Sequence, residues 1–214
     1  MKTPASQFQT VLQTLQKLGF LVESDPILLS VCSLITGEPI RGSWWSHRFA
    51  QRIFQVNEQL EDHPDVIITK LISGKVTFVH RSIWSELITI AKARAAWQFQ
   101  KLSTPAMGLL AQVDAAGCLT SAEAVWPQKE NVKLGDATRE LEKKLLIVAT
   151  QFHSESGAHQ KRLQTWEHWT KERKFKTAKI SIEEAKARCE KKLASLNKRF
   201  DADAKLPWQQ GRGG

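Results

Sequence analysis

Residues 66–80 read Val66-Ile67-Ile68-Thr69-Lys70-Leu71-Ile72-Ser73-Gly74-Lys75-Val76-Thr77-Phe78-Val79-His80. Two runs rich in β-branched residues flank a Ser-Gly pair, a pattern typical of a β-hairpin. Apolar residues recur at helical spacing in three segments before it, which predicts helices over 7–18, 27–35 and 47–61. Ser24-Asp25-Pro26 favours the start of the second helix, because it places a capping residue before a proline. A further helix is expected over 82–99.

The second half of the chain repeats this order. Helical patterns cover 104–116, 120–123 and 136–146, and strands are expected over 146–153 and 158–166 around a second Ser-Gly pair. Three helices followed by a hairpin is the winged-helix layout, in which the third helix reads the DNA groove and the hairpin forms the wing. The sequence therefore predicts a mainly helical α+β fold with two β-hairpins, built from tandem winged-helix-like units.

A charged helix is expected over 181–200, with a short apolar stripe that we expect to pack back on the body. The predicted divisions are a first unit with a linking helix (1–99), a second unit (100–175), a basic C-terminal helix (176–206) and a disordered tail (207–214).

Composition excludes several classes of protein. The 214 residues contain no apolar run long enough to span a membrane, and the N-terminus has no apolar segment typical of a secretory signal. Three widely spaced cysteines, Cys32, Cys118 and Cys189, indicate reduced thiols and a cytoplasmic protein, not a disulfide framework or a zinc cluster.

The positive charge is concentrated late in the chain. The formal net charge is +9, and residues 158–214 carry 15 basic against 7 acidic side chains. A basic surface of this kind attracts polyanions such as nucleic acid. Solvated lysine-rich helices that only maintain solubility are the plain alternative.

Polar side chains on the two predicted third helices and on the second hairpin are the candidate DNA contacts. Arg and Lys bind guanine edges and phosphates, and Gln binds adenine. These candidates are Arg139, Lys143, Lys144, His159, Gln160, Lys161, Arg162, Arg48, Gln51 and Arg52. An ordinary exposed helix face and a basic hairpin explain the same residues equally well.

Signals for catalysis are weak. The chain has no nucleotide-binding glycine loop, no nucleophile elbow and no metalloprotease motif, so we predict no catalytic residue, no metal and no cofactor. The run Glu61-Asp62-His63-Pro64 is interpreted as a charged helix end. Of Trp44 and Trp45, one is expected to anchor its loop, and the other is left open as a stacking surface.

The motifs Gly42-Ser43-Trp44-Trp45-Ser46-His47 and 71–84 resemble a group of bacterial proteins, as does the segment 145–166. That group is in turn loosely similar to the AlkZ/YcaQ family of winged-helix DNA glycosylases. The resemblance covers about residues 24–170, and it implies the fold and an association with nucleic acid.

Those glycosylases carry a Gln-apolar-Gln or Gln-apolar-Asp pair on a strand-like segment. Gln7-Phe8-Gln9 and Gln98-Phe99-Gln100 match the letters, but both fall in predicted helices, where the two glutamines point about 200° apart. We therefore assign the catalytic role to neither pair.

The sequence favours a non-catalytic protein that binds double-stranded DNA, with no membrane partner and an oligomeric state left open. A glycosylase-like repair enzyme acting on alkylated bases is the first alternative. A protein-interaction module, with the hairpins and tryptophans docking a partner, is the second.

Overall fold

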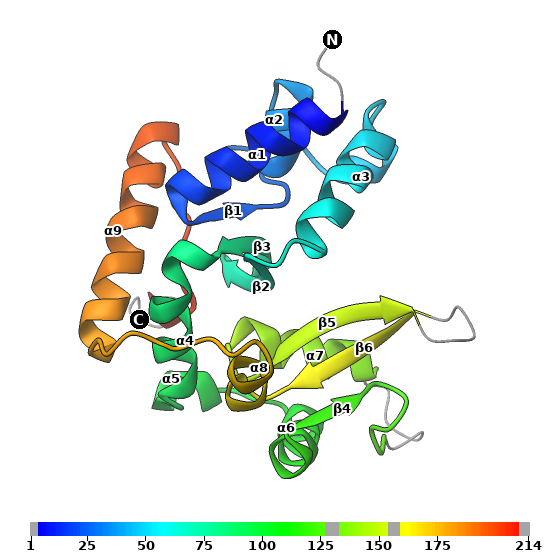
Figure 1. Ribbon diagram of the computed structural model, residues 1–214, viewed down its shortest axis with the longest axis vertical. Helices are drawn as coiled ribbons and strands as arrows, with labels where there is room; N and C mark the ends of the chain where they lie inside the picture. Colours follow the sequence, from blue (N-terminus) through cyan, green and yellow to red (C-terminus); the bar gives the residue numbers. More distant parts are fainter. Residues whose placement is uncertain (1–3, 127–132, 154–158, 210–214) are drawn as a thin grey trace.

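The computed structural model describes residues 4–126, 133–153 and 159–209 (Figure 1). Helices dominate, and two small antiparallel sheets of three strands each lie among them. The expected class, a mainly helical α+β fold with two β-hairpins, is confirmed. We call residues 4–80 the N-terminal unit and residues 104–164 the C-terminal unit.

The N-terminal unit contains the predicted hairpin and one strand that periodicity did not reveal. Its elements are α1 (Pro4–Leu18), β1 (Phe20–Val22), α2 (Val31–Thr36), a 3₁₀ turn (Trp44–Ser46), α3 (Ala50–Glu61), β2 (Val66–Ile72) and β3 (Lys75–His80). Ser73 and Gly74 form the hairpin turn with φ of 49° and 68°. The sheet order is β1-β3-β2, which leaves β2 at an edge of the sheet.

The C-terminal unit follows a similar plan. Its elements are α6 (Thr104–Ala116), β4 (Cys118–Thr120), α7 (Leu134–Lys143), β5 (Val148–His153) and β6 (His159–Gln164). β4 pairs with β6 as β1 pairs with β3, so the order β4-β6-β5 leaves β5 at an edge. The expected turn at 155–157 lies outside the described residues. The edge strands β2 and β5, one from each sheet, approach each other where the units meet.

Four more helices connect and cover the units. These are α4 (Trp84–Lys92), α5 (Ala96–Phe99), α8 (Trp166–Glu172) and α9 (Ile182–Phe200), with short 3₁₀ turns at Arg81–Ile83 and Pro207–Gln209. α9 runs beside α4 along one side of the molecule, away from the β5–β6 hairpin (Figure 1).

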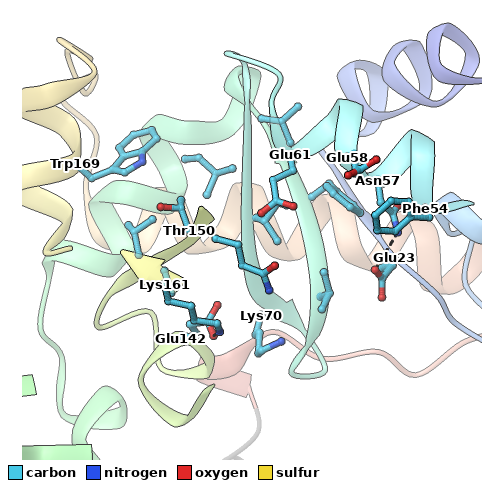
Figure 2. A pocket seen from close by; sticks show the side chains of 18 of the residues that line it. Glu23, Phe54, Asn57, Glu58, Glu61, Lys70, Glu142, Thr150, Lys161 and Trp169 are labelled. Carbon is cyan, nitrogen blue, oxygen red and sulfur yellow. Dashed lines mark hydrogen bonds and ion pairs between the residues drawn. The ribbon is translucent and has the colours of Figure 1, made fainter. Parts of the chain in front are cut away.

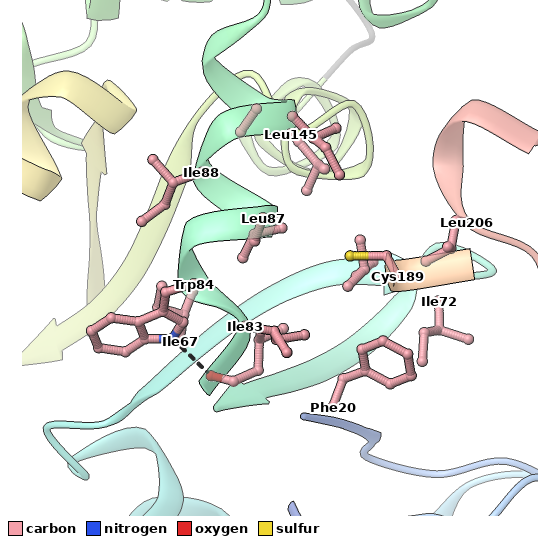
Figure 3. Close-up of a cluster of buried hydrophobic side chains, with 14 of the residues drawn as sticks. Phe20, Ile67, Ile72, Ile83, Trp84, Leu87, Ile88, Leu145, Cys189 and Leu206 are labelled. Carbon is pink, nitrogen blue, oxygen red and sulfur yellow. Dashed lines mark hydrogen bonds between the residues drawn. The ribbon is translucent and has the colours of Figure 1, made fainter. Parts of the chain in front are cut away.

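One apolar core joins both units (Figure 3). Trp84 and Trp166 are among its largest side chains, and each is almost completely buried. The N–H group of each indole is also hydrogen-bonded: Trp84 Nε1 donates to Val79 O at 3.1 Å, and Trp166 Nε1 donates to Leu145 O at 2.9 Å. Buried indoles with paired N–H groups contribute large apolar contact without an uncompensated polar atom. The two units are therefore held in a fixed relation.

The expectation that the C-terminal helix packs on the body is confirmed. Its apolar stripe enters the shared core through Ala185, Cys189, Leu193 and Leu196. Lys192 Nζ donates to the carbonyl of Leu18 at 3.2 Å, where a cation suits the negative end of α1.

The predicted start of the second helix is wrong. Asp25 does not begin a helix, because its carboxylate accepts hydrogen bonds from the backbone N–H groups of Ile27 and Leu28, both at 2.8 Å, and folds a tight turn. Lys75 Nζ lies 2.6 Å from the same carboxylate. Ser30 is the real cap of α2, in a reciprocal arrangement with Ser33.

Two other predicted helices also differ. The single helix expected over 82–99 breaks at Arg94, whose φ is 47° and whose guanidinium pairs with Asp114. The short helix expected over 120–123 is a turn, because Thr120 and Glu123 exchange side-chain and backbone hydrogen bonds instead of starting a helix.

Both Gln-apolar-Gln segments place their two glutamines apart, as expected. Gln98 is fully buried while Gln100 is exposed. The Gln98 side chain donates to the carbonyls of Ala91 and Lys144, both at 3.1 Å, and accepts from Ala95 N. Gln98 therefore ties α5 to the C-terminal unit, which is a structural role.

The tail expected to be disordered is ordered over Pro207–Gln209. Trp208 is buried, and its Nε1 donates to Glu190 Oε1 at 2.6 Å. Ser73 N also donates to Lys205 O at 2.8 Å, which fixes the chain just before this turn. Burial of the indole and its hydrogen bond lower the free energy by more than the conformational entropy that the chain end would gain if it were free. Residues 210–214 lie outside the described part of the chain.

Candidate functional site

A cavity of about 270 Å³ lies where the edge strands β2 and β5 approach each other. We call it the inter-unit cleft. Figure 2 shows Phe54, Asn57 and Glu23 grouped at one end, Lys161, Glu142 and Thr150 at the other, and Glu61 between them. The cleft thus combines aromatic rings, carboxylates and lysines that come from both units.

Helix α3 supplies one wall of the cleft. Ile53, Val56 and Leu60 bury one side of this helix in the N-terminal core. The opposite side carries Phe54, Asn57, Glu58 and Glu61, whose spacing of three and four residues places them on one face. The helix therefore presents an aromatic and acidic face to the cleft.

Glu23 closes the same end of the cleft. Asn57 Nδ2 donates to Glu23 Oε1 at 3.0 Å, and the side chain of Trp44 also donates to this carboxylate. Burial raises the pKa of Glu23, while the bond from Trp44 and the charge of Lys70 act in the opposite direction.

Glu61 lies in the middle of the cleft. The surrounding walls desolvate its carboxylate and raise its pKa, and the charge of Asp62 raises it further. A hydrogen bond from the backbone of Gln151 and the charge of Lys161 act against that shift. The side chain keeps access to solvent, so Glu61 is both perturbed and reachable.

Four cations from both units gather at the other end. Glu142, which is only 5% exposed, accepts from Lys161 Nζ at 3.5 Å. Burial lowers the pKa of Lys70; Glu142 opposes this, while the positive charges of Lys161, Arg139 and Lys143 lower it further. We call Lys70, Arg139, Lys143 and Lys161 the cation cluster.

The cation cluster extends into an adjoining, more open groove of about 500 Å³. Lys70 lines both the cleft and this groove, so the two hollows are neighbours. Lys75, Arg139 and Lys143 add positive charge to the groove, and Glu23 and Asp25 lie on its wall. Lys75 pairs with Asp25, and Arg139 Nη1 pairs with Asp136 at 3.0 Å. Arg139 and Lys143 are both exposed there.

The structure separates the DNA contacts predicted in the C-terminal unit into two groups. Arg139, Lys143 and Lys161 join the cation cluster. Lys144 turns inward, where its Nζ donates to Trp97 O at 3.3 Å, and Arg162 pairs with Glu172 at 2.7 Å. Gln160 lies on β6 opposite Phe152, and the side chain of His159 lies outside what the structure describes.

The contacts predicted in the N-terminal unit lie elsewhere. Arg48 and Arg52 both stack over Phe49, with guanidinium-to-ring distances of 4.9 and 5.4 Å, and Gln51 is exposed nearby. None of these three lines the cleft or the groove. The tryptophan pair divides as expected, since Trp44 is 7% exposed and anchors the loop while Trp45 is 64% exposed.

Sequence patterns missed the acidic side of the site. Glu58 and Glu61 share α3, while Glu23 and Glu142 come from two other stretches of the chain, and only the fold brings the three stretches together. One signal was present, because Lys70 interrupts an apolar strand, where a lysine needs a polar surrounding.

The described residues contain no group of three or more His, Cys, Asp or Glu side chains that is arranged to hold a metal ion. No helix among them has the length and apolar character needed to cross a bilayer. The three cysteines are free thiols, and Cys32 and Cys189 are buried.

Comparison with known proteins decides the family. A family model described as AlkZ related matches residues 5–205, almost the whole chain. This chain belongs to the AlkZ-related family. The expected relationship is confirmed, and it links this AlkZ-related chain to DNA repair glycosylases. No curated protein and no solved structure gives a significant match.

The raised pKa of Glu23 predicts a pH dependence of stability. Between the ordinary value of 4.5 and the raised value, the folded state binds more protons than the unfolded state. The free energy of unfolding should therefore fall as pH rises through this window.

Glu23→Gln keeps an acceptor for Asn57 but removes the ionisation, so its stability should vary less with pH. Urea unfolding over a pH series measures this. Asp203→Asn, at a carboxylate 89% exposed, should follow the unmodified protein. An unchanged pH profile in Glu23→Gln would contradict the assignment.

Proposed function

We propose that this chain binds double-stranded DNA across the inter-unit cleft and the adjoining groove. The supporting observation is the cation cluster, which draws Lys70 from the N-terminal unit and Arg139, Lys143 and Lys161 from the C-terminal unit. Cations brought together from distant segments form a polyanion site, because each phosphate they neutralise releases condensed counterions.

The order of elements in the N-terminal and C-terminal units supports the winged-helix-like divisions predicted from the sequence, 1–99 and 100–175. In each unit, a helix and a short strand precede a second sheet-flanking helix and a hairpin, and the first strand pairs with the last. α7 would be the reader helix of the C-terminal unit and β5–β6 its wing.

The packing of α7 limits how it can touch DNA. α6 and β2 cover two of its sides, and its exposed face carries Arg139 and Lys143, four residues apart. These two side chains lie on the groove, so phosphate contact fits the arrangement better than deep insertion into a major groove.

α9 has no part in this interface. Among the described residues, its lysines and arginines line neither the cleft nor the groove. The sequence led us to expect that basic residues of the C-terminal helix contribute to DNA binding. In this proposal, the cations that bind DNA come from β2, α7 and β6 instead. A DNA partner and free thiols both favour the cytoplasm as the site of action.

Binding should depend steeply on salt and on the groove cations. Fluorescence anisotropy with a labelled duplex should show strong binding at about 50 mM salt and much weaker binding at about 200 mM. Arg139→Gln with Lys143→Gln should reduce the slope of log K against log salt by about 1.8, since each lost phosphate contact removes roughly 0.9. Lys191→Gln with Lys198→Gln, at exposed positions on α9, is the matched control and should leave the slope unchanged.

Two results would overturn this proposal. The first is absence of binding at about 50 mM salt. The second is a larger effect of the α9 control than of the groove variant, which would move the interface to the other side of the molecule.

A glycosylase-like activity is the second candidate, and Glu61 is the observation that favours it. A carboxylate with a raised pKa in a reachable cleft is a stronger base than an ordinary glutamate and is suited to take a proton from water. The water oxygen would bond to the sugar C1′ as the C1′–N bond breaks, and the base would leave with that electron pair. Gln98 has no such role, because its side chain is buried and bound to the backbone.

Incubation with a duplex containing an alkylated purine tests this candidate through the abasic sites that form. We expect excision by the unmodified protein, loss in Glu61→Gln and full activity in Gln100→Ala, which changes an exposed glutamine outside the cleft. Absence of excision, or equal excision by Glu61→Gln, would eliminate the glycosylase-like activity. DNA binding would then be the one proposed function that remains.

A further inference from the structure

Trp45 is a large aromatic side chain that the core does not use. One face of its ring stacks on Trp44, with centroids 4.1 Å apart and planes 23° apart. Phe54 lies beside it at 5.9 Å and is itself 41% exposed. Because 64% of Trp45 remains accessible, the ring has an open surface at the rim of the inter-unit cleft.

The wall next to these rings offers hydrogen-bond acceptors. Its carboxylates belong to Glu23 and Glu58, and Asn57 Oδ1 is buried without a hydrogen-bond partner among the described residues. Two of the nearby donors, Asn57 Nδ2 and the Trp44 side chain, already bind Glu23. A ligand group that pairs with these acceptors must supply the donors.

The size of the cleft suits a small flat ligand. Its volume of about 270 Å³ lies just below the roughly 300–1,000 Å³ of pockets for drug-sized molecules. An exposed aromatic face beside an acceptor wall matches a nucleobase that stacks and donates through an exocyclic amine.

The geometry points to a subsite at Trp45, Phe54, Asn57 and Glu58 that binds one unpaired, amine-bearing base. Adenine and cytosine present amine donors, whereas thymine presents a carbonyl at the equivalent position. The cation cluster at the other end of the cleft holds the phosphates, so the acidic wall contacts the base edge and not the backbone. This inference rests on the proposed DNA binding.

Three labelled duplexes test the subsite by anisotropy: one fully paired, one with a single unpaired adenine and one with a single unpaired thymine. The unpaired adenine should bind about tenfold more tightly than the paired duplex, the scale of one base stacked on an aromatic ring. Trp45→Ala should abolish this preference and leave affinity for the paired duplex unchanged, while Trp45→Phe should retain most of it. Met107→Ala, 49% exposed on α6, is the control and should change nothing.

The acceptor wall has its own variant. Glu58→Gln introduces a donor, so binding of the unpaired thymine should rise towards that of the unpaired adenine. Equal affinity of the unmodified protein for all three duplexes would overturn the subsite, as would a uniform loss in Trp45→Ala.

A measurement without duplex DNA separates this inference from the proposed function. Adenosine, which has no phosphate, should shift the indole N–H resonance of Trp45 in ¹⁵N-labelled full-length protein, assigned by its absence in Trp45→Phe. Thymidine should shift it much less. If every duplex fails to bind while adenosine shifts Trp45, the subsite stands and the proposed duplex binding falls. No shift with adenosine at millimolar concentration would overturn the subsite.

Discussion

The shared apolar core between the two sheets is the constraint on which the remaining structure depends. Trp84 of α4 and Trp166 of α8 help to fill it, and each indole N–H is paired with a backbone carbonyl, Val79 O of the N-terminal unit and Leu145 O of the C-terminal unit. Gln98 adds hydrogen bonds between the α4–α5 region and the carbonyl of Lys144. Because these contacts hold one unit against the other, the edge strands β2 and β5 lie side by side with the inter-unit cleft between their elements.

That fixed junction explains how charge is distributed across the cleft. α3 can carry an acidic face only because its opposite face is buried in the N-terminal core. α7 directs Arg139 and Lys143 outward because Leu141 and Ala137 face its own core. The cations therefore meet at one end and the aromatic, acceptor-rich wall at the other. Such a division suits a ligand with an anionic backbone and neutral, donor-bearing rings, which describes nucleic acid.

Features encoded by short-range patterns were predicted from the sequence. The hairpin at 66–80 and the helix at 181–200 each carry their turn or cap within a few residues, so local spacing defines them. β1 and β4 were missed because three residues form a strand only when a distant partner pairs with them. The carboxylates of the cleft were missed for the same reason, since Glu23, Glu61 and Glu142 meet only after folding. Counting charge along the chain drew attention to α9, although the cation cluster lies on other elements.

Amide hydrogen exchange of the full chain, with and without a short DNA duplex, tests the central claim most directly. The account predicts that DNA slows exchange in β2, at the C-terminal end of α7 and in β6, where the cation cluster lies, and leaves exchange in α9 unchanged. Protection confined to α9, or to the segment around Arg48 and Arg52, would contradict it.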